Sequence, residues 1–306
     1  MKLTGEKILI GTSSFAALDK APLVCLRQTG CEVVDNPVKR RLTRPELIDL
    51  LATGITGLIA GMEVLDREAL EKSQLRVISR CGSGISNVDI VSAKKLGIKV
   101  CYTPDAPTGA VAELTLGAML SLLRMIPEMN RDLHNGRWNK KVGLQLEGKT
   151  VAIIGYGRIG KRFASLLRPF GVSIIAVDPA LREDGNVETL PLDEALGMAD
   201  IITIHSGGEA QIIGEKEFRL MKKGVILLNA ARGNLVCETS LVTALEKGLV
   251  RGAWLDVFND EPYNGPLKEY PQVILTPHVG SYTLECRKQM EMQAVNNLIK
   301  AFGEDT

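Results

Sequence analysis

The segment TVAIIGYGRIG, residues 150–160, decides the fold of this chain. A strand-like apolar run leads directly into three glycines spaced GxGxxG, and a helix-like segment, KRFASLLRPFG, follows at 161–171. Gly155 permits a tight turn, Gly157 lets the backbone approach a pyrophosphate, and Gly160 lets helix and strand pack closely. A pyrophosphate at the start of the helix would meet N–H groups that lack internal partners. The segment therefore predicts a dinucleotide-binding βαβ unit.

The next apolar run, VSIIAVD, ends in Asp178, 18 positions after Gly160. An acidic residue about 20 positions on completes the dinucleotide fingerprint. Its carboxylate hydrogen-bonds the ribose hydroxyls and repels a 2′-phosphate, which favours NAD over NADP. Arg182 is the nearby residue that would suit a 2′-phosphate instead. A turn without a ligand is the alternative, and the flanking strand, helix and carboxylate favour the cofactor site.

Working outward, short runs rich in Ile, Val and Leu alternate with longer amphipathic segments along most of the chain. Apolar runs of this length are typical of parallel strands that are covered by helices on both faces. The chain is therefore expected to be α/β. The expected strands are 7–11, 31–35, 57–61, 76–79, 98–102, 150–155, 172–178, 200–205, 224–229, 252–257 and 272–276.

The segment from 107 to 134 reads as helix for much longer than its neighbours, and Pro127 is expected to bend or break it. Five expected strands precede this segment and six follow it. We therefore place a domain boundary near residue 103. A length of 306 residues also fits two domains.

Composition excludes several classes of partner. Lys and Arg number 37 against 36 Asp and Glu, so no nucleic acid or anionic membrane is expected to bind. No signal peptide and no apolar run of about 20 residues is present, so a cytoplasmic protein is expected. The six cysteines form no CxxC pair, which predicts free thiols in a reducing compartment and no metal site.

Three polar residues follow expected strands of the second domain: Arg232 in NAARGNLV, Glu261 in LDVFNDEP, and His278 in LTPHVGS. Parallel α/β sheets bind ligands at the carboxyl ends of their strands. Arg232 would hold a substrate carboxylate through two hydrogen bonds, and His278 would exchange a proton with a substrate oxygen. Glu261 beside the imidazole would stabilise its charged form. Each residue alone fits an ordinary surface or turn position, so the prediction depends on their combination with the NAD site.

Several further motifs carry a resemblance. In chain order they are RCGSGISNVD (80–89), TGAVAELTLGAML (108–120), HNGRWNK (134–140), GYGRIG (155–160), LLNAARGNLV (227–236), GAWLDVFNDEP (252–262) and LTPHVGSYTLE (275–285). The chain resembles the D-isomer-specific 2-hydroxyacid dehydrogenase family over essentially its whole length. Phosphoglycerate dehydrogenases and glyoxylate/hydroxypyruvate reductases are the most similar branches.

The resemblance implies a Rossmann NAD-binding domain, 103–282, inserted in a flavodoxin-like substrate domain, 1–102 plus 283–306. It implies that Arg232, Glu261 and His278 are catalytic, and that the activity is hydride transfer between NAD and a D-2-hydroxy acid or its 2-keto form. It also implies a homodimer formed through the nucleotide domain. The implied cofactor contacts are Gly155, Gly157, Arg158, Ile159, Gly160, Asp178, His205, Ser206, Ala230, Asp256 and Gly280. The implied substrate contacts are the amides of Gly82, Ser83 and Gly84, with Arg232 and His278.

The chain departs from the family pattern at several positions. Ser206-Gly207-Gly208-Glu209 replaces a Pro-Leu-Thr-type segment, so the affinity for the cofactor is expected to differ. Cys237 stands where Asp is usual, and Trp254 replaces a small residue. Glu261, where formate dehydrogenases carry Gln, argues against formate as the substrate.

The substrate is left open between 3-phosphoglycerate and a small unphosphorylated acid. Phosphoglycerate dehydrogenases often carry an Arg after the third strand, where this chain has AGMEVLD with Glu63. Arg80 and the cluster 39–41 are the cations that would compensate, and the regulatory domain of many such enzymes is expected to be absent. Two rivals are an NAD-sensing corepressor-like interaction protein and an enzyme acting on phosphonate or phosphite.

Overall fold

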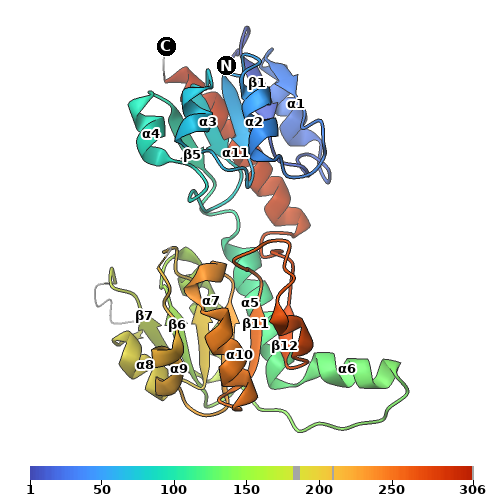
Figure 1. Ribbon diagram of the computed structural model, residues 1–306, viewed down its shortest axis with the longest axis vertical. Coiled ribbons are helices and arrows are strands. Elements are labelled where there is room, and N and C mark those ends of the chain that lie inside the picture. The colour runs from blue at the N-terminus through green and yellow to red at the C-terminus, as the bar shows by residue number, and fades with distance from the viewer. Residues whose placement is uncertain (182–186, 209, 305–306) are drawn as a thin grey trace. The chain divides into compact units, whose positions relative to one another are not determined.

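The computed structural model describes residues 1–181, 187–208 and 210–304. The chain divides into two compact units, Met1–Pro107 with Tyr282–Thr306 and Thr108–Ser281. Both chain ends belong to the first unit (Figure 1). The domain limits expected from the sequence fall at 102/103 and 282/283, a few residues from these. Arg182 and Glu209, noted in the sequence, lie outside the described residues.

The first unit is a five-stranded parallel sheet with helices on both faces. Its strands are β1 (Lys7–Ile10), β2 (Glu32–Val34), β3 (Gly57–Ala60), β4 (Val77–Arg80) and β5 (Lys99–Tyr102). Its helices are α1 (Ala21–Gln28), α2 (Arg44–Leu51), α3 (Arg67–Glu71), α4 (Ile90–Lys95) and α11 (Leu284–Gly303). The strand order β2-β1-β3-β4-β5 is that of flavodoxin-like folds. α1 and α11 build the core on one face, and α2, α3 and α4 build the core on the other.

The second unit is a seven-stranded parallel sheet, also covered on both faces. Its strands are β6 (Thr150–Ile154), β7 (Ser173–Val177), β8 (Glu188–Thr189), β9 (Ile201–Ile204), β10 (Val225–Asn229), β11 (Val250–Leu255) and β12 (Val273–Leu275). Its helices are α5 (Thr108–Leu123), α6 (Ile126–His134), α7 (Arg158–Leu167), α8 (Leu192–Met198), α9 (Glu215–Leu220) and α10 (Glu238–Glu246), with 3-10 turns η1 (Arg168–Phe170), η2 (Gly233–Leu235) and η3 (Pro266–Glu269).

The strand order β12-β11-β10-β9-β6-β7-β8 contains the Rossmann arrangement, in which the strand order reverses next to the first strand, β6. α5 and α7 pack on one face of the sheet, and α8, α9 and α10 pack on the other. The predicted α/β architecture is confirmed. β8 is not among the expected strands because it has two residues and no apolar run.

The long helix expected over 107–134 is two helices, α5 and α6, bent by 66°. Met125 between them has a φ of 53°, and Pro127 lies in the first turn of α6. A proline in a first turn costs no hydrogen bond, because the N–H it lacks would have no helical partner. The predicted break is therefore confirmed, two residues before the proline. Among the described residues no single helix is long and apolar enough to cross a membrane; α5 and α6 pass that test only as a bent pair.

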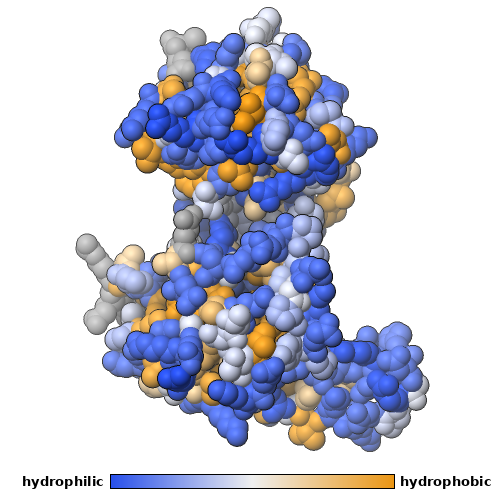
Figure 2. All heavy atoms as spheres, viewed as in Figure 1, coloured by the Kyte–Doolittle hydropathy of each residue, from blue (hydrophilic) through white to orange (hydrophobic). Residues whose placement is uncertain are grey.

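One face of the molecule is mostly hydrophilic. Figure 2 shows hydrophilic side chains predominating on this face, with apolar ones scattered between them. Isolated apolar groups of this kind are normal on a folded protein.

Candidate active site

The glycine turn after β6 has the geometry that a pyrophosphate needs. A Cβ at Gly155, whose φ is +90°, would lie 2.5 Å from the Ser206 amide nitrogen, and one at Gly160 would lie 2.3 Å from the Gly155 carbonyl. These two positions therefore accept only glycine. A Cβ at Gly157 would meet nothing within 4 Å, so the backbone there faces open space. The turn fits a ligand that approaches the main chain at Gly157.

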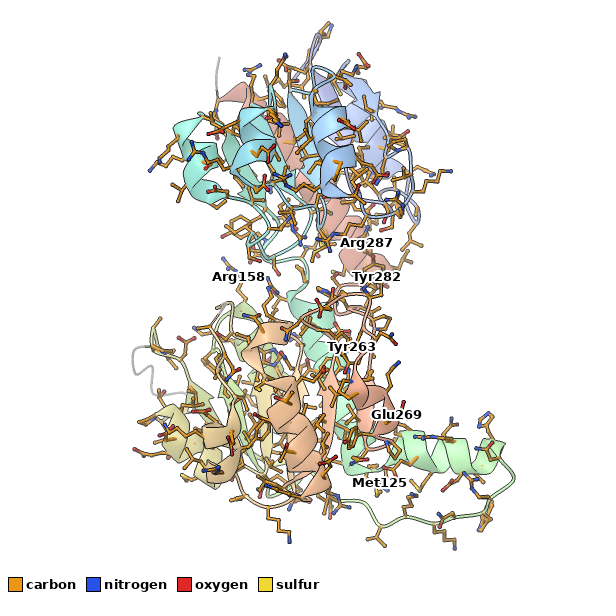
Figure 3. All side chains as sticks on the ribbon, in the orientation of Figure 1. Met125, Arg158, Tyr263, Glu269, Tyr282 and Arg287 are labelled. Carbon is orange, nitrogen blue, oxygen red and sulfur yellow. The ribbon has the colours of Figure 1, made fainter. Side chains whose placement is uncertain are left out.

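Asp178 is fixed at the end of β7, beside this turn. Its Oδ2 accepts the Tyr156 N–H at 2.9 Å and its Oδ1 accepts the Ala180 N–H at 2.9 Å. The first contact ties the carboxylate to the glycine turn. α7 begins directly after Gly157, and Figure 3 shows Arg158 at that N-terminal end. The helix N-terminus supplies the favourable field for a phosphate anion.

His205 follows β9 and packs against the same turn. Its Nε2 lies 3.0 Å from Thr203 Oγ1, and its ring is 5.5 Å from the ring of Phe163. Burial lowers the pKa of His205 to about 4, so the imidazole is neutral at pH 7. Its Nδ1 is buried and has no hydrogen-bond partner among the described residues. An orphaned polar atom at this edge fits a site that is completed by a ligand.

Arg232 is presented by a loop that Asn229 organises. Asn229 ends β10 and is fully buried. Its Nδ2 donates to the Arg232 carbonyl at 2.8 Å, and its Oδ1 accepts the Ala231 N–H at 3.0 Å. The Arg232 guanidinium donates to the Ala231 carbonyl at 2.6 Å. Asn229 was not predicted as a site residue, although a polar residue that ends a wholly apolar strand is a usable signal.

Glu261 and His278 are in direct contact. The His278 Nδ1 lies 2.9 Å and 3.1 Å from the two carboxylate oxygens of Glu261. The Phe258 N–H also donates to Glu261, at 3.1 Å. Phe258 stacks on Tyr263 with ring centroids 4.1 Å apart, which closes the loop that carries Glu261 (Figure 3 labels Tyr263). The imidazole is 39% exposed, so its Nε2 side can reach a substrate.

Asp256 has a structural role that the sequence did not suggest. It is 1% exposed, and its two carboxylate oxygens accept hydrogen bonds from Thr276, Val279 and Gly280. The resemblance implied that Asp256 contacts the cofactor. Its hydrogen bonds within the chain also hold the loop that carries His278.

The loops after β10, β11 and β12 come together because these strands are neighbours in the sheet. A Cβ at Gly233 would lie 2.1 Å from the Phe258 carbonyl carbon, so the Arg232 loop packs tightly on the loop that carries Glu261. Arg232, Glu261 and His278 thus belong to one packed group of loops at the carboxyl edge. A cation, an imidazole and a carboxylate grouped in this way can bind a carboxylate and transfer a proton.

The loop 82–84, expected to contact substrate, lies in the first unit after β4. The Gly82 N–H donates to Thr103 Oγ1 at 2.7 Å, a hydrogen bond within this unit. A Cβ at Gly82 would lie 1.7 Å from an Arg80 nitrogen, so Arg80 is packed directly under this loop.

Several of the cations that the sequence offered for a substrate phosphate already have partners within the first unit. Arg80 is 9% exposed and donates to the Cys81 carbonyl. Arg40 forms an ion pair with Glu46 at 2.7 Å. Glu63 is 2% exposed, and burial raises its pKa. Arg80 and Arg41 oppose that rise in pKa, so their charges already act on Glu63.

Comparison with known proteins gives one consistent result. The family model described as D-isomer specific 2-hydroxyacid dehydrogenase, NAD binding domain, matches residues 116–280. A glyoxylate reductase of Thermofilum pendens is 39% identical over 252 residues, which are 77% of this chain and 74% of that protein. The crystal structure of the TT0316 protein from Thermus thermophilus superposes with a TM-score of 0.89 at 31% identity, over 97% of both chains.

A second group of relatives is longer than this chain. A D-3-phosphoglycerate dehydrogenase of Methanocaldococcus jannaschii is 38% identical over 269 residues, which are 84% of this chain and 51% of that protein. The chain therefore spans about half the length of these relatives. The family match includes the glycine turn, Asp178, Arg232, Glu261 and His278.

Proposed function

Because the chain belongs to the D-isomer-specific 2-hydroxyacid dehydrogenase family, we propose that it interconverts a 2-keto acid and a D-2-hydroxy acid with NAD as cofactor. The observation that carries this proposal is the His278–Glu261 contact at 2.9 Å, at the same sheet edge as the glycine turn and Arg232. A proton donor, a carboxylate anchor and an NAD site are the three parts that this reaction requires.

When bound, NADH supplies the hydride that adds to the carbonyl carbon of the keto acid. His278 then gives the proton on Nε2 to the carbonyl oxygen, and the product is the hydroxy acid. Glu261 keeps Nδ1 protonated and fixes the ring, because its carboxylate only accepts hydrogen bonds. In the reverse direction the neutral imidazole takes the hydroxyl proton.

Arg232 holds the substrate carboxylate in this proposal. A guanidinium matches a carboxylate with two parallel N–H groups, which fixes the orientation of the keto group as well as its position. The amides of Ser83 and Gly84 are proposed as further donors to the substrate. The remaining expected cofactor contacts, among them Ile159, Ser206 and Ala230, are proposed on the family resemblance.

A panel of 2-keto acids tests the proposed function. We expect oxidation of NADH, followed at 340 nm, with glyoxylate or hydroxypyruvate as the substrate. The rate with NADH should be at least about tenfold higher than the rate with NADPH, because the Asp178 carboxylate repels a 2′-phosphate. Asp178→Asn keeps the shape of the side chain and removes its charge, so it should lower the ratio of the NADH rate to the NADPH rate. Equal rates with the two cofactors in the wild type would contradict the role of Asp178. No turnover across the panel, with NADH still bound, would contradict the enzyme assignment and favour the sensing role.

A phosphorylated acid is the second candidate, since several relatives are D-3-phosphoglycerate dehydrogenases. We take an unphosphorylated acid as the first candidate, because the buried Glu63 stands in the segment after the third strand where phosphoglycerate dehydrogenases often carry an Arg. Including 3-phosphohydroxypyruvate in the panel decides between the two. A preference for it over hydroxypyruvate would reverse this choice.

We also propose a homodimer formed through α6 and the segment after it. Figure 1 shows this arm projecting from the body of the second unit. Two of its apolar side chains are the most exposed large hydrophobic side chains among the described residues: Trp138 by 80% and Val142 by 88%, with Leu133 exposed by 55%. Burying such groups against a second copy would remove apolar surface from water, which favours the dimer.

A cytoplasmic location is proposed as well, since all six cysteines are free thiols.

Light scattering on a sizing column tests the dimer. We expect a mass of twice 33.2 kDa for the wild type and a shift toward the monomer for Trp138→Ser combined with Val142→Ser. Leu18→Ser is the matched control, because Leu18 is 63% exposed but lies in the first unit. A monomeric wild type, or a double variant that stays dimeric, would argue against this interface.

A further inference from the structure

The Asp256 carboxylate lies at the centre of a hydrogen-bond network beneath His278. Its Oδ1 accepts the Thr276 hydroxyl at 2.6 Å and the Val279 N–H at 2.9 Å. Its Oδ2 accepts the Gly280 N–H at 2.8 Å. These bonds hold the chain on both sides of His278.

The network continues into the core of the unit through Trp254. The indole Nε1 of Trp254 donates to Thr276 Oγ1 at 3.0 Å, and Trp254 is fully buried in β11. An indole N–H only donates, and an ionised carboxylate only accepts. The Thr276 hydroxyl must therefore accept from Trp254 and give its single proton to Asp256. The Trp254 donor and the Asp256 acceptor thus fix the direction of both hydrogen bonds. We call these three residues, Trp254, Thr276 and Asp256, the relay.

His278 has a backbone conformation that requires such support. Its φ is 54°, in the left-handed region that residues other than glycine rarely adopt. Conformations of this kind persist only where the surrounding structure imposes them. The Asp256 bonds to Val279 and Gly280 impose it from one side, and the His278 N–H donates to the Thr276 carbonyl at 2.9 Å on the other.

We propose that Trp254 and Thr276 are positioning residues for His278, and that they act through Asp256. Glu261 orients the imidazole ring, and the Trp254–Thr276–Asp256 relay holds the backbone that carries it. Trp254 fixes the Thr276 hydroxyl so that its proton points at the carboxylate. This inference rests on the proposed function, in which His278 is the proton donor.

The test is a pair of variants at Thr276. Thr276→Val keeps the shape and loses the hydroxyl, whereas Thr276→Ser keeps the hydroxyl. We expect Thr276→Val to lower kcat for glyoxylate or hydroxypyruvate about tenfold, because a displaced proton donor slows the chemical step. Thr276→Ser should stay within about twofold of the wild type. Trp254→Phe, which removes only the outermost donor of the relay, should lower kcat about threefold.

A buried variant outside the relay separates positioning from stability. Leu196→Ala removes a fully buried side chain from α8 in the same unit, so it should lower the Tm and leave kcat unchanged. A Thr276→Val enzyme that keeps kcat within about twofold of the wild type would overturn the proposal. A Thr276→Ser enzyme as slow as Thr276→Val would overturn it too, because the hydroxyl would then be irrelevant.

A second measurement does not depend on turnover. We expect faster hydrogen exchange at the Val279 and Gly280 amides in Thr276→Val, and wild-type exchange in Thr276→Ser. The chain has three histidines, so the ring signal of His278 can be assigned by NMR and should shift in Thr276→Val. If the wild type turned over none of the 2-keto acids, the proposed function would fail, and unchanged exchange in Thr276→Val would separately overturn the relay.

Discussion

Replacing His278 by asparagine is expected to lower kcat by a factor of about 10²–10⁴, the usual range for losing a general acid. Asparagine is the informative substitution, because it tolerates the left-handed φ of 54° that His278 adopts. The loop should keep its shape, and the Kd for NADH should stay within about twofold. The measurement is kcat for glyoxylate or hydroxypyruvate, together with a fluorescence titration of NADH.

The control for this experiment is Glu261→Gln. Glutamine can still accept a hydrogen bond from Nδ1, but this bond lacks the charge of the carboxylate and is weaker, so a smaller loss of about tenfold is expected. Turnover by His278→Asn within about threefold of the wild type would refute the assigned proton donor. A loss of NADH binding in that variant would show instead that the loop had collapsed.

Arg232→Ala is expected to lower kcat/KM for the keto acid by about 10²–10⁴. This factor follows from losing two hydrogen bonds between charged groups, each worth about 1.5–3 kcal/mol. The loop itself should survive, because Asn229 holds it through backbone groups and not through the guanidinium. The Kd for NADH should therefore be unchanged, which a titration checks.

Arg232→Lys separates charge from geometry. Lysine keeps the positive charge and loses the paired N–H groups, so an intermediate loss of about 10–100-fold is expected. If Arg232→Lys were as active as the wild type, a simple charge would suffice and the two-point anchor would be wrong. If Arg232→Ala kept the wild-type kcat/KM, Arg232 would not contact the substrate.

Much of the fold could be predicted, because the strong signals in this chain are local. Apolar runs mark the buried strands, since a strand covered on both faces has no polar side to show. β8 was not predicted, because its two residues make no such run. The break before Pro127 could be placed only to within two residues. The hydrogen bonds of Gly82 to Thr103 and of Asp256 to the loop 276–280 could not be predicted, because the partners are far apart along the chain.

The sequence by itself determined the parts of this protein that depend on spacing along the chain. The glycine turn 155–160, Asp178 at the end of the next strand, and the positions of Arg232, Glu261 and His278 after their strands all belong to this group. A turn type or the end of a strand is set by neighbouring residues, so it can be recognised without knowing the rest of the fold.

Only the tertiary structure decided which side chains meet. Trp254 and Thr276 are 22 positions apart and lie on or next to adjacent strands, so nothing in their spacing predicts the bond between them. The burial that keeps His205 neutral and the tight packing of Gly233 on Phe258 likewise depend on residues that are far apart along the chain. Side-chain contacts of this kind depend on packing in three dimensions, to which the order of residues gives no direct guide.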